Sequence, residues 1–129
     1  MSEYEARILV VDDVPENVRL LEAVLTAHAY DVVSATNGAS ALEAVKSEKP
    51  DLILLDIVMP DIDGVDALGR LRADARTASI PVVALTAQAM HGDRERFLDG
   101  GFDAYISKPV DIVGFVKTVK EHCGEADRE

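Results

Sequence analysis

The chain has 129 residues and a formal net charge of −11, from 24 acidic and 13 basic side chains. This length suits one compact domain over residues 1–129 and leaves little room for a second. The acidic balance argues against direct nucleic-acid binding, which needs clustered lysine and arginine. Neither a bilayer-spanning apolar stretch of roughly 20 residues nor a signal segment is present, so we expect a cytoplasmic protein without membrane insertion.

Short apolar runs alternate with helical patterns along the chain. In chain order, the expected elements are strand Arg7–Val11, helix Pro15–His28, strand Asp31–Ser34, helix Gly38–Lys49, strand Leu52–Leu55, helix Val65–Arg72, strand Ile80–Leu85, helix Gln88–Asp99, strand Asp103–Ile106 and helix Asp111–His122. Pro15 suits the first turn of its helix, and Asp13 is placed to cap that helix. Residues 124–129 are expected to form a flexible tail outside a core of about residues 7–122.

This alternation predicts the fold class. Repeated strand–helix units with right-handed crossovers give an α/β fold: a single doubly wound, five-stranded parallel sheet, (βα)5, with helices on both faces. The third strand, Leu52–Leu55, is apolar without alternation, as expected for a strand that is covered on both sides. The pattern does not by itself fix the strand order.

Polar residues follow four of the expected strands where each strand ends. Asp12 and Asp13 follow the first strand, Asp56 the third, Thr86 the fourth and Lys108 the fifth. Ligands of open α/β sheets bind outside the carboxyl ends of the strands, and common strand orders place the first and third strands side by side. We therefore expect one site for a hard cation and an anion.

The three aspartates favour a metal ion, because clustered carboxylates repel one another unless a cation relieves them. Mg²⁺ prefers oxygen ligands at about 2.0–2.1 Å and retains several waters. The alternative is that Asp12 is only a turn residue and Asp13 only a helix cap. Lys108 precedes Pro109, and a cis peptide bond at this step would direct the ammonium back toward Asp56.

With these residues in place, the sequence resembles the CheY-like receiver domains of response regulators from about Arg7 to His122. Asp12-Asp13 and three segments carry the resemblance: Leu52–Pro60, Pro81–Ala87 and Ala104–Pro109. The resemblance implies the strand order 2-1-3-4-5. The later half of the chain is similar to stand-alone DivK-type regulators. The first thirty residues are similar to the leading receiver of PleD-type diguanylate cyclases.

The resemblance implies a regulator of a two-component or phosphorelay system. Asp56 would accept a phosphoryl group from a sensor histidine kinase or a histidine phosphotransfer protein. Mg²⁺, or alternatively Mn²⁺, would be held by Asp12, Asp13, Asp56 and the backbone carbonyl of Val58. Lys108 would pair with the phosphoryl oxygens. Such a protein is not a conventional enzyme, because it catalyses only its own phosphorylation and slow dephosphorylation.

The same resemblance implies a switch. Thr86 would reorient to bind the phosphoryl group, and Tyr105 would move inward with it. A downstream protein would then bind the face formed by the fourth helix, the fifth strand and the fifth helix. Val58 and Gln88 occupy the positions that tune water access to the phosphoryl group. Because Val58 is apolar, we expect slow self-hydrolysis unless Gln88 or a partner assists.

Two alternatives remain open at the level of sequence. The receiver fold would serve as a constitutive binding module if it acted without phosphorylation. The segment from Asp61 to Val65 also fits the Asp-x-Asp-x-Val pattern of haloacid-dehalogenase-type phosphatases. In those enzymes the first aspartate ends a buried strand, whereas here Pro60 precedes Asp61 and the expected strand has already ended at Leu55.

Overall fold

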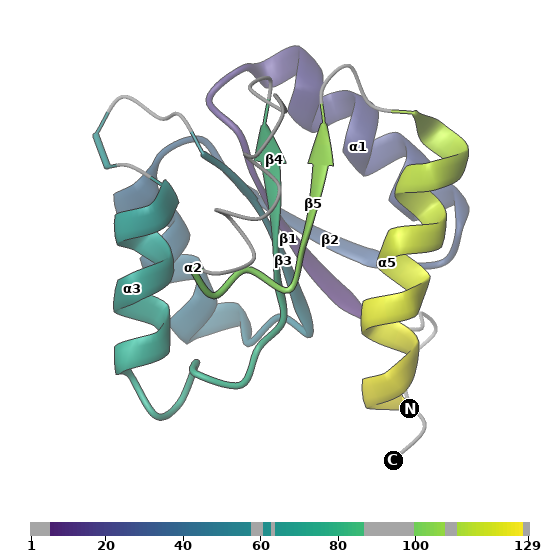
Figure 1. The fold of residues 1–129 in the computed structure, drawn as a ribbon. Helices are drawn as coiled ribbons and strands as arrows, with labels where there is room; N and C mark the ends of the chain where they lie inside the picture. Colours follow the sequence, from purple (N-terminus) through teal and green to yellow (C-terminus); the bar gives the residue numbers. More distant parts are fainter. Residues whose placement is uncertain (1–5, 58–60, 63, 87–99, 108–110, 128–129) are drawn as a thin grey trace.

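The computed structural model describes residues 6–57, 61–62, 64–86, 100–107 and 111–127 (Figure 1). In chain order its elements are β1 (Arg7–Val11), α1 (Pro15–Ala27), β2 (Asp31–Ala35), α2 (Gly38–Glu48), β3 (Leu52–Asp56), α3 (Gly64–Ala73), β4 (Val82–Thr86), β5 (Ala104–Ser107) and α5 (Ile112–Asp127). The expected helix over residues 88–99 lies outside the described residues. Within those residues, no helix has the length and apolar character needed to cross a bilayer.

The strands form one parallel sheet in the order β2-β1-β3-β4-β5, which confirms the predicted order. Helices α1 and α5 cover one face, and α2 and α3 cover the other (Figure 1). Every residue of β3 and β4 is buried. Burial on both faces explains why these strands are apolar without alternation.

The two faces of the sheet have separate apolar cores. In β3, Leu54 packs in the cluster formed with α1 and α5, whereas Leu55 packs in the cluster formed with α2 and α3. Successive side chains of a strand point to opposite faces, so each central strand contributes to both cores. Each such leucine contributes about 1.5–3 kcal/mol by burial, which holds the strand ends in register.

Several element boundaries differ from those expected. The cap prediction for Asp13 is wrong: α1 begins at Pro15 with Val14 as its N-cap, and the apolar side chain of Val14 makes no capping bond. β4 begins at Val82 rather than Ile80, since the Ile80 amide closes a turn onto Thr77 O at 3.1 Å. Helix α5 continues to Asp127, so residues 124–127 are helical where we expected a tail.

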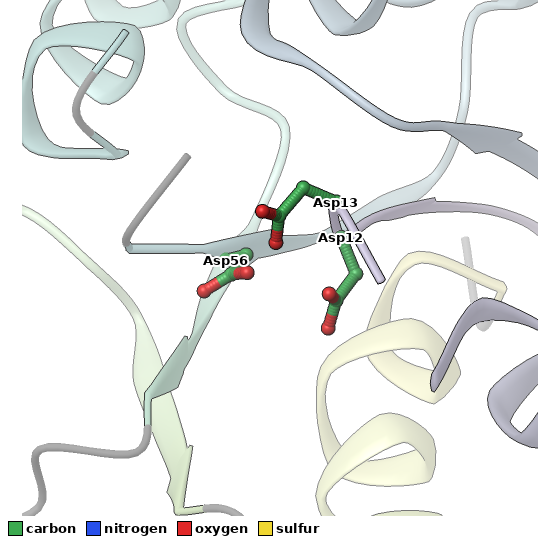
Figure 2. A group of neighbouring side chains, drawn as sticks. All are labelled: Asp12, Asp13 and Asp56. Atoms are coloured by element: carbon green, nitrogen blue, oxygen red, sulfur yellow. The ribbon is translucent and has the colours of Figure 1, made fainter. Parts of the chain in front are cut away.

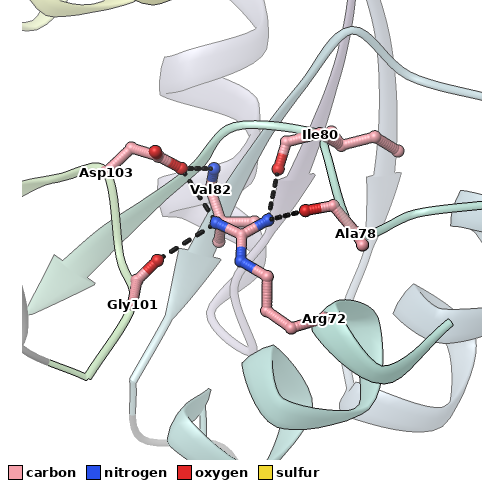
Figure 3. A network of polar contacts seen from close by, with 6 residues as sticks. All are labelled: Arg72, Ala78, Ile80, Val82, Gly101 and Asp103. Carbon is pink, nitrogen blue, oxygen red and sulfur yellow. Dashed lines mark hydrogen bonds and ion pairs between the residues drawn. The ribbon is translucent and has the colours of Figure 1, made fainter. Parts of the chain in front are cut away.

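Arg72 of α3 joins three segments at the amino edge of the sheet, opposite the predicted site (Figure 3). Its guanidinium donates to the backbone carbonyls of Ala78, Ile80 and Gly101 at 3.0, 2.7 and 3.1 Å. It also pairs with Asp103 Oδ2 at 2.9 Å, and the same oxygen accepts from Val82 N at 2.8 Å. One half-buried side chain thereby connects α3 to the segments that enter β4 and β5.

Replacing Arg72 with alanine is expected to lower the free energy of unfolding by about 2 kcal/mol, because four acceptors lose a charged donor. Arg72→Lys should recover only part of this, since an ammonium cannot reproduce the planar fork of donors. Arg70, exposed on the same helix, provides the matched control, and Arg70→Ala should change stability by less than about 0.5 kcal/mol. Urea unfolding measures all three variants; equal losses for Arg70→Ala and Arg72→Ala contradict the assignment.

Candidate functional site

Three aspartates meet at the carboxyl edge of the sheet (Figure 2). Val11 of β1 pairs with Leu55 of β3, so the residues that follow, Asp12 and Asp56, emerge side by side. Asp13 is the next residue along the chain. One carboxylate oxygen from each aspartate lies within 4.8 Å of the others. Asp12 and Asp56 are buried and Asp13 is exposed, so the cluster opens to solvent on one side.

Asp12 is fixed by the start of α1. Its Oδ1 accepts from Val14 N at 3.0 Å, and its Oδ2 accepts from Asn17 Nδ2 at 3.4 Å. Its own amide donates to Ala35 O of β2 at 3.2 Å. The sequence analysis did not identify Asn17 as a site residue. Its position in the first turn of the helix that follows the two aspartates could have indicated a contact with them. These contacts orient one carboxylate before any cation is bound.

The donor set fits Mg²⁺. Ligands at about 2.1 Å in octahedral geometry lie about 3.0 Å apart when adjacent and about 4.2 Å apart when opposite. The carboxylate oxygens, all within 4.8 Å of one another, lie close to this range of separations. The exposed side leaves room for the waters that Mg²⁺ retains. This arrangement supports the expected choice of cation, with Mn²⁺ as the alternative.

Gly64, the first residue of α3, packs directly against the backbone of the site. Its amide donates to Ile57 O at 2.8 Å. A Cβ at this position would lie 2.8 Å from the carbonyl oxygen of Asp56 and 2.8 Å from the Cα of Ile57. Real Cβ atoms do not approach backbone this closely, so only glycine fits here without moving Asp56.

Gly64→Ala is expected to lower the free energy of unfolding by about 1–3 kcal/mol, because backbone atoms must move to admit the methyl group. Gly69, in the same helix, is exposed, and a Cβ added there would meet nothing within 4 Å. Gly69→Ala should therefore raise stability by up to about 1 kcal/mol, the difference in helix propensity. Thermal unfolding of both variants checks the contrast, and destabilisation of equal size would contradict it.

Thr86 and Tyr105 lie on the neighbouring strands β4 and β5, and β4 pairs with the strand that ends in Asp56. Thr86 ends β4 one residue after Leu85, the register partner of Asp56, and it is buried. Tyr105 of β5 pairs with Ala84, is half-buried and packs against the α2–α3 core. Because side chains alternate along a strand, Thr86 and Ala84 point to the same face, on which Tyr105 also packs. The geometry brings both expected switch residues to one face of the sheet.

Some predicted site residues lie outside the described residues: Val58, Gln88, Lys108 and the Lys108–Pro109 bond.

Asp61 lies five residues after β3 ends at Asp56. Its carboxylate accepts from the amides of Gly38 and Ala39 at 2.9 and 3.0 Å. Asp61 is therefore not the strand-end aspartate that the phosphatase alternative requires, and that alternative gains no support from the fold.

Comparison with known proteins agrees with this geometry. A profile of the response regulator receiver domain matches residues 8–120. The polar-differentiation response regulator DivK of Brucella anthropi is 39% identical over 119 residues, which cover 92% of this chain and 97% of DivK. A protein from Chloroflexus aurantiacus, described as a response regulator, has a structure with a TM-score of 0.87 at 30% identity; the match covers 92% of this chain and 98% of that chain.

A further solved structure bears on the metal. The receiver domain of the sensor histidine kinase PA1611 from Pseudomonas aeruginosa has a TM-score of 0.84 at 33% identity, over 92% of this chain and 98% of that chain. Its structure is described with a magnesium ion coordinated in the active-site cleft.

Fold and site together define a class: a doubly wound α/β signalling domain with a carboxylate cluster at the carboxyl edge of a 2-1-3-4-5 sheet. Within that class, the chain belongs to the response regulator receiver family of two-component signalling. The family resemblance read from the sequence, including the similarity to DivK-type regulators, is confirmed.

Proposed function

We propose that this chain is a phosphorylation-dependent regulator that accepts a phosphoryl group on Asp56 in a Mg²⁺-dependent reaction and then changes its partner-binding face. One observation carries the proposal. Asp56 ends the central strand β3 with its carboxylate beside those of Asp12 and Asp13, an arrangement that suits a metal-assisted nucleophile.

The proposed reaction begins with a carboxylate oxygen of Asp56 attacking the phosphorus of a phosphohistidine. An O–P bond forms, the P–N bond breaks, and the imidazole leaves with the electron pair of the broken bond. When bound, Mg²⁺ would neutralise charge on the phosphoryl oxygens. Asp12, whose carboxylate accepts from Val14 N and Asn17 Nδ2, would be a metal ligand of fixed orientation, and Lys108 is the proposed cationic partner of the phosphoryl oxygens.

The proposed response passes through Thr86 and Tyr105. A phosphoryl group on Asp56 adds negative charge and acceptor oxygens, which the hydroxyl of Thr86 would satisfy from the adjacent strand. Movement of Thr86 would open space on the face where Tyr105 packs and alter the surface around β5 and α5. That surface, with residues 88–99, is the proposed contact for a downstream protein.

The proposed phosphoryl donors are a sensor histidine kinase and a histidine phosphotransfer protein, and the proposed location is the cytoplasm. The family membership supports such partners. The net charge of −11 supports protein partners rather than nucleic acid. Slow self-hydrolysis remains our prediction, because an apolar Val58 cannot position the attacking water.

Titration with Mg²⁺ and beryllofluoride, a phosphoryl mimic, tests the switch in ¹⁵N-labelled protein. The amide resonances of Thr86 and Tyr105 are expected to shift when both reagents are present, and to shift much less with Mg²⁺ alone. Asp56→Asn, which removes the carboxylate that the mimic must bind, should abolish the difference. Unchanged amides in the wild-type protein would favour a constitutive binding module instead.

A further inference from the structure

A pocket lies between the edge strand β5 and helix α5, on the surface proposed as the contact for a downstream protein. β5 is the last strand in the sheet order, and α5 runs alongside it (Figure 1). The pocket has a volume of about 330 Å³, and the side chains that line it include those of Asp103, Tyr105, Ser107, Thr118, Glu121 and His122. None of these residues belongs to the aspartate cluster, so the pocket is separate from the proposed phosphorylation site.

Two side chains of α5 that line the pocket use their hydrogen-bond donors within the helix. Thr118 Oγ1 donates to Gly114 O at 3.0 Å. His122 Nδ1 lies 2.9 Å from Thr118 O, and because a carbonyl oxygen only accepts, Nδ1 carries the hydrogen. Neutral His122 therefore keeps Nε2 as an acceptor. Both side chains retain acceptor lone pairs, rather than these donors, for a ligand in the pocket.

The charges around the pocket favour a cation. The lining, all of it within the described part of the chain, has two carboxylates and neither lysine nor arginine. The Asp103 carboxylate is balanced by Arg72, which pairs with its Oδ2 at 2.9 Å. Glu121 is exposed, and no ion pair found among the described residues joins it to a base. One negative charge and several acceptors are therefore available to a ligand.

The ring of Tyr105 distinguishes between the two common cationic side chains. A planar cation over an aromatic face gains a cation–π interaction. A guanidinium is planar and presents five N–H donors in a fixed fork, whereas an ammonium is a compact point charge with three donors. Acceptors spread over β5 and α5, with an aromatic ring beside them, therefore suit arginine better than lysine.

We propose that the pocket between β5 and α5 binds an arginine side chain of the downstream protein, with the guanidinium beside Glu121 and against the ring of Tyr105. The inference deepens the proposed function by naming the chemistry of the partner, and it rests on that function for the partner's role. Binding of arginine itself needs no phosphoryl group, so the pocket is testable in the unmodified protein.

The test titrates ¹⁵N-labelled protein, without Mg²⁺, with Nα-acetyl-arginine amide. The amide resonances of Ser107, Thr118 and Glu121 are expected to shift and to saturate, with a dissociation constant of about 1–10 mM for so small a ligand. Nα-acetyl-citrulline amide has nearly the same shape without the charge, and it should bind at least about fivefold more weakly. Equal binding of the two compounds would overturn the assignment of a cation site.

Substitution of Glu121 locates the site. Glu121→Gln should raise the dissociation constant of the arginine compound by about 2–5-fold, the usual effect of an exposed ion pair. Glu121→Lys places an ammonium at the pocket and should abolish saturable binding. Glu43, exposed on α2 at the other face of the sheet, provides the matched control. Glu43→Gln and Glu43→Lys make the same changes of net charge and should leave the dissociation constant unchanged.

The outcomes separate the two proposals. Shifts that do not saturate, or that weaken equally in the Glu43 and Glu121 variants, would mean general attraction to an acidic surface and would overturn the pocket. Saturable binding in a chain whose Thr86 and Tyr105 amides do not respond to Mg²⁺ and beryllofluoride would support the pocket and overturn the proposed switch. A normal response to beryllofluoride without saturable binding of arginine overturns the pocket alone.

Discussion

Asp56→Asn is expected to reduce phosphorylation of this chain by more than about a thousandfold, because the amide oxygen is a poor nucleophile and the cluster loses one of its three charges. Incubation with acetyl phosphate and Mg²⁺ followed by intact-mass measurement checks this. Wild-type protein should gain one phosphoryl group, and Asp56→Asn should gain none.

The matched control for this substitution is Asp66→Asn. Asp66 is exposed in the first turn of α3, so the variant makes the same change of charge away from the cluster. It should be phosphorylated at the wild-type rate. Phosphorylation of Asp56→Asn at the rate of Asp66→Asn would mean that another residue accepts the phosphoryl group.

Asp13→Asn is expected to weaken Mg²⁺ binding by about a hundredfold, equivalent to about 2.8 kcal/mol, since one anionic ligand is lost. The metal-free variant should be more stable than the wild type. Two unit charges at the cluster's upper limit of 4.8 Å repel by about 0.9 kcal/mol in water. Asp13 is exposed, so relief of this repulsion should raise the melting temperature by a few degrees.

Thermal unfolding with and without Mg²⁺ measures both effects. In Asp13→Asn the melting temperature should start higher and rise less on addition of Mg²⁺. Asp12→Asn should differ, because Asp12 is buried and accepts from Val14 N and Asn17 Nδ2, so its replacement also disturbs the start of α1. A Mg²⁺-induced rise in Asp13→Asn equal to that of the wild type would show that Asp13 is not a ligand.

The parts of the site that sequence alone predicted share one physical cause. Strands in a parallel sheet all end at the same edge, so residues that follow apolar runs converge even when they are distant in the chain. Asp12, Asp13 and Asp56 were found in this way, and so was the placement of Thr86 beside them. The strand order needed the family resemblance, because apolar patterns do not say which strands are neighbours.

Apart from the local contact of Asn17 with Asp12, the contacts that sequence reasoning missed include long-range bonds between a side chain and the backbone. Asp61 reaches the amides of Gly38 and Ala39 across 22–23 residues, and Arg72 reaches the carbonyl of Gly101 across 29 residues. Backbone donors and acceptors are the same in every residue, so such bonds leave no sequence pattern. The Asp13 cap failed for a local reason, since Pro15 set the helix start one residue later than an Asp13 cap requires.

Phosphotransfer profiling tests the central claim most directly. Wild-type protein and Asp56→Asn are incubated with a set of purified, phosphorylated histidine kinases and histidine phosphotransfer proteins in the presence of Mg²⁺. We expect rapid loss of label from at least one donor to the wild-type chain and no transfer to Asp56→Asn. Transfer that survives the substitution undiminished would contradict the assignment of Asp56 as the phosphoryl acceptor.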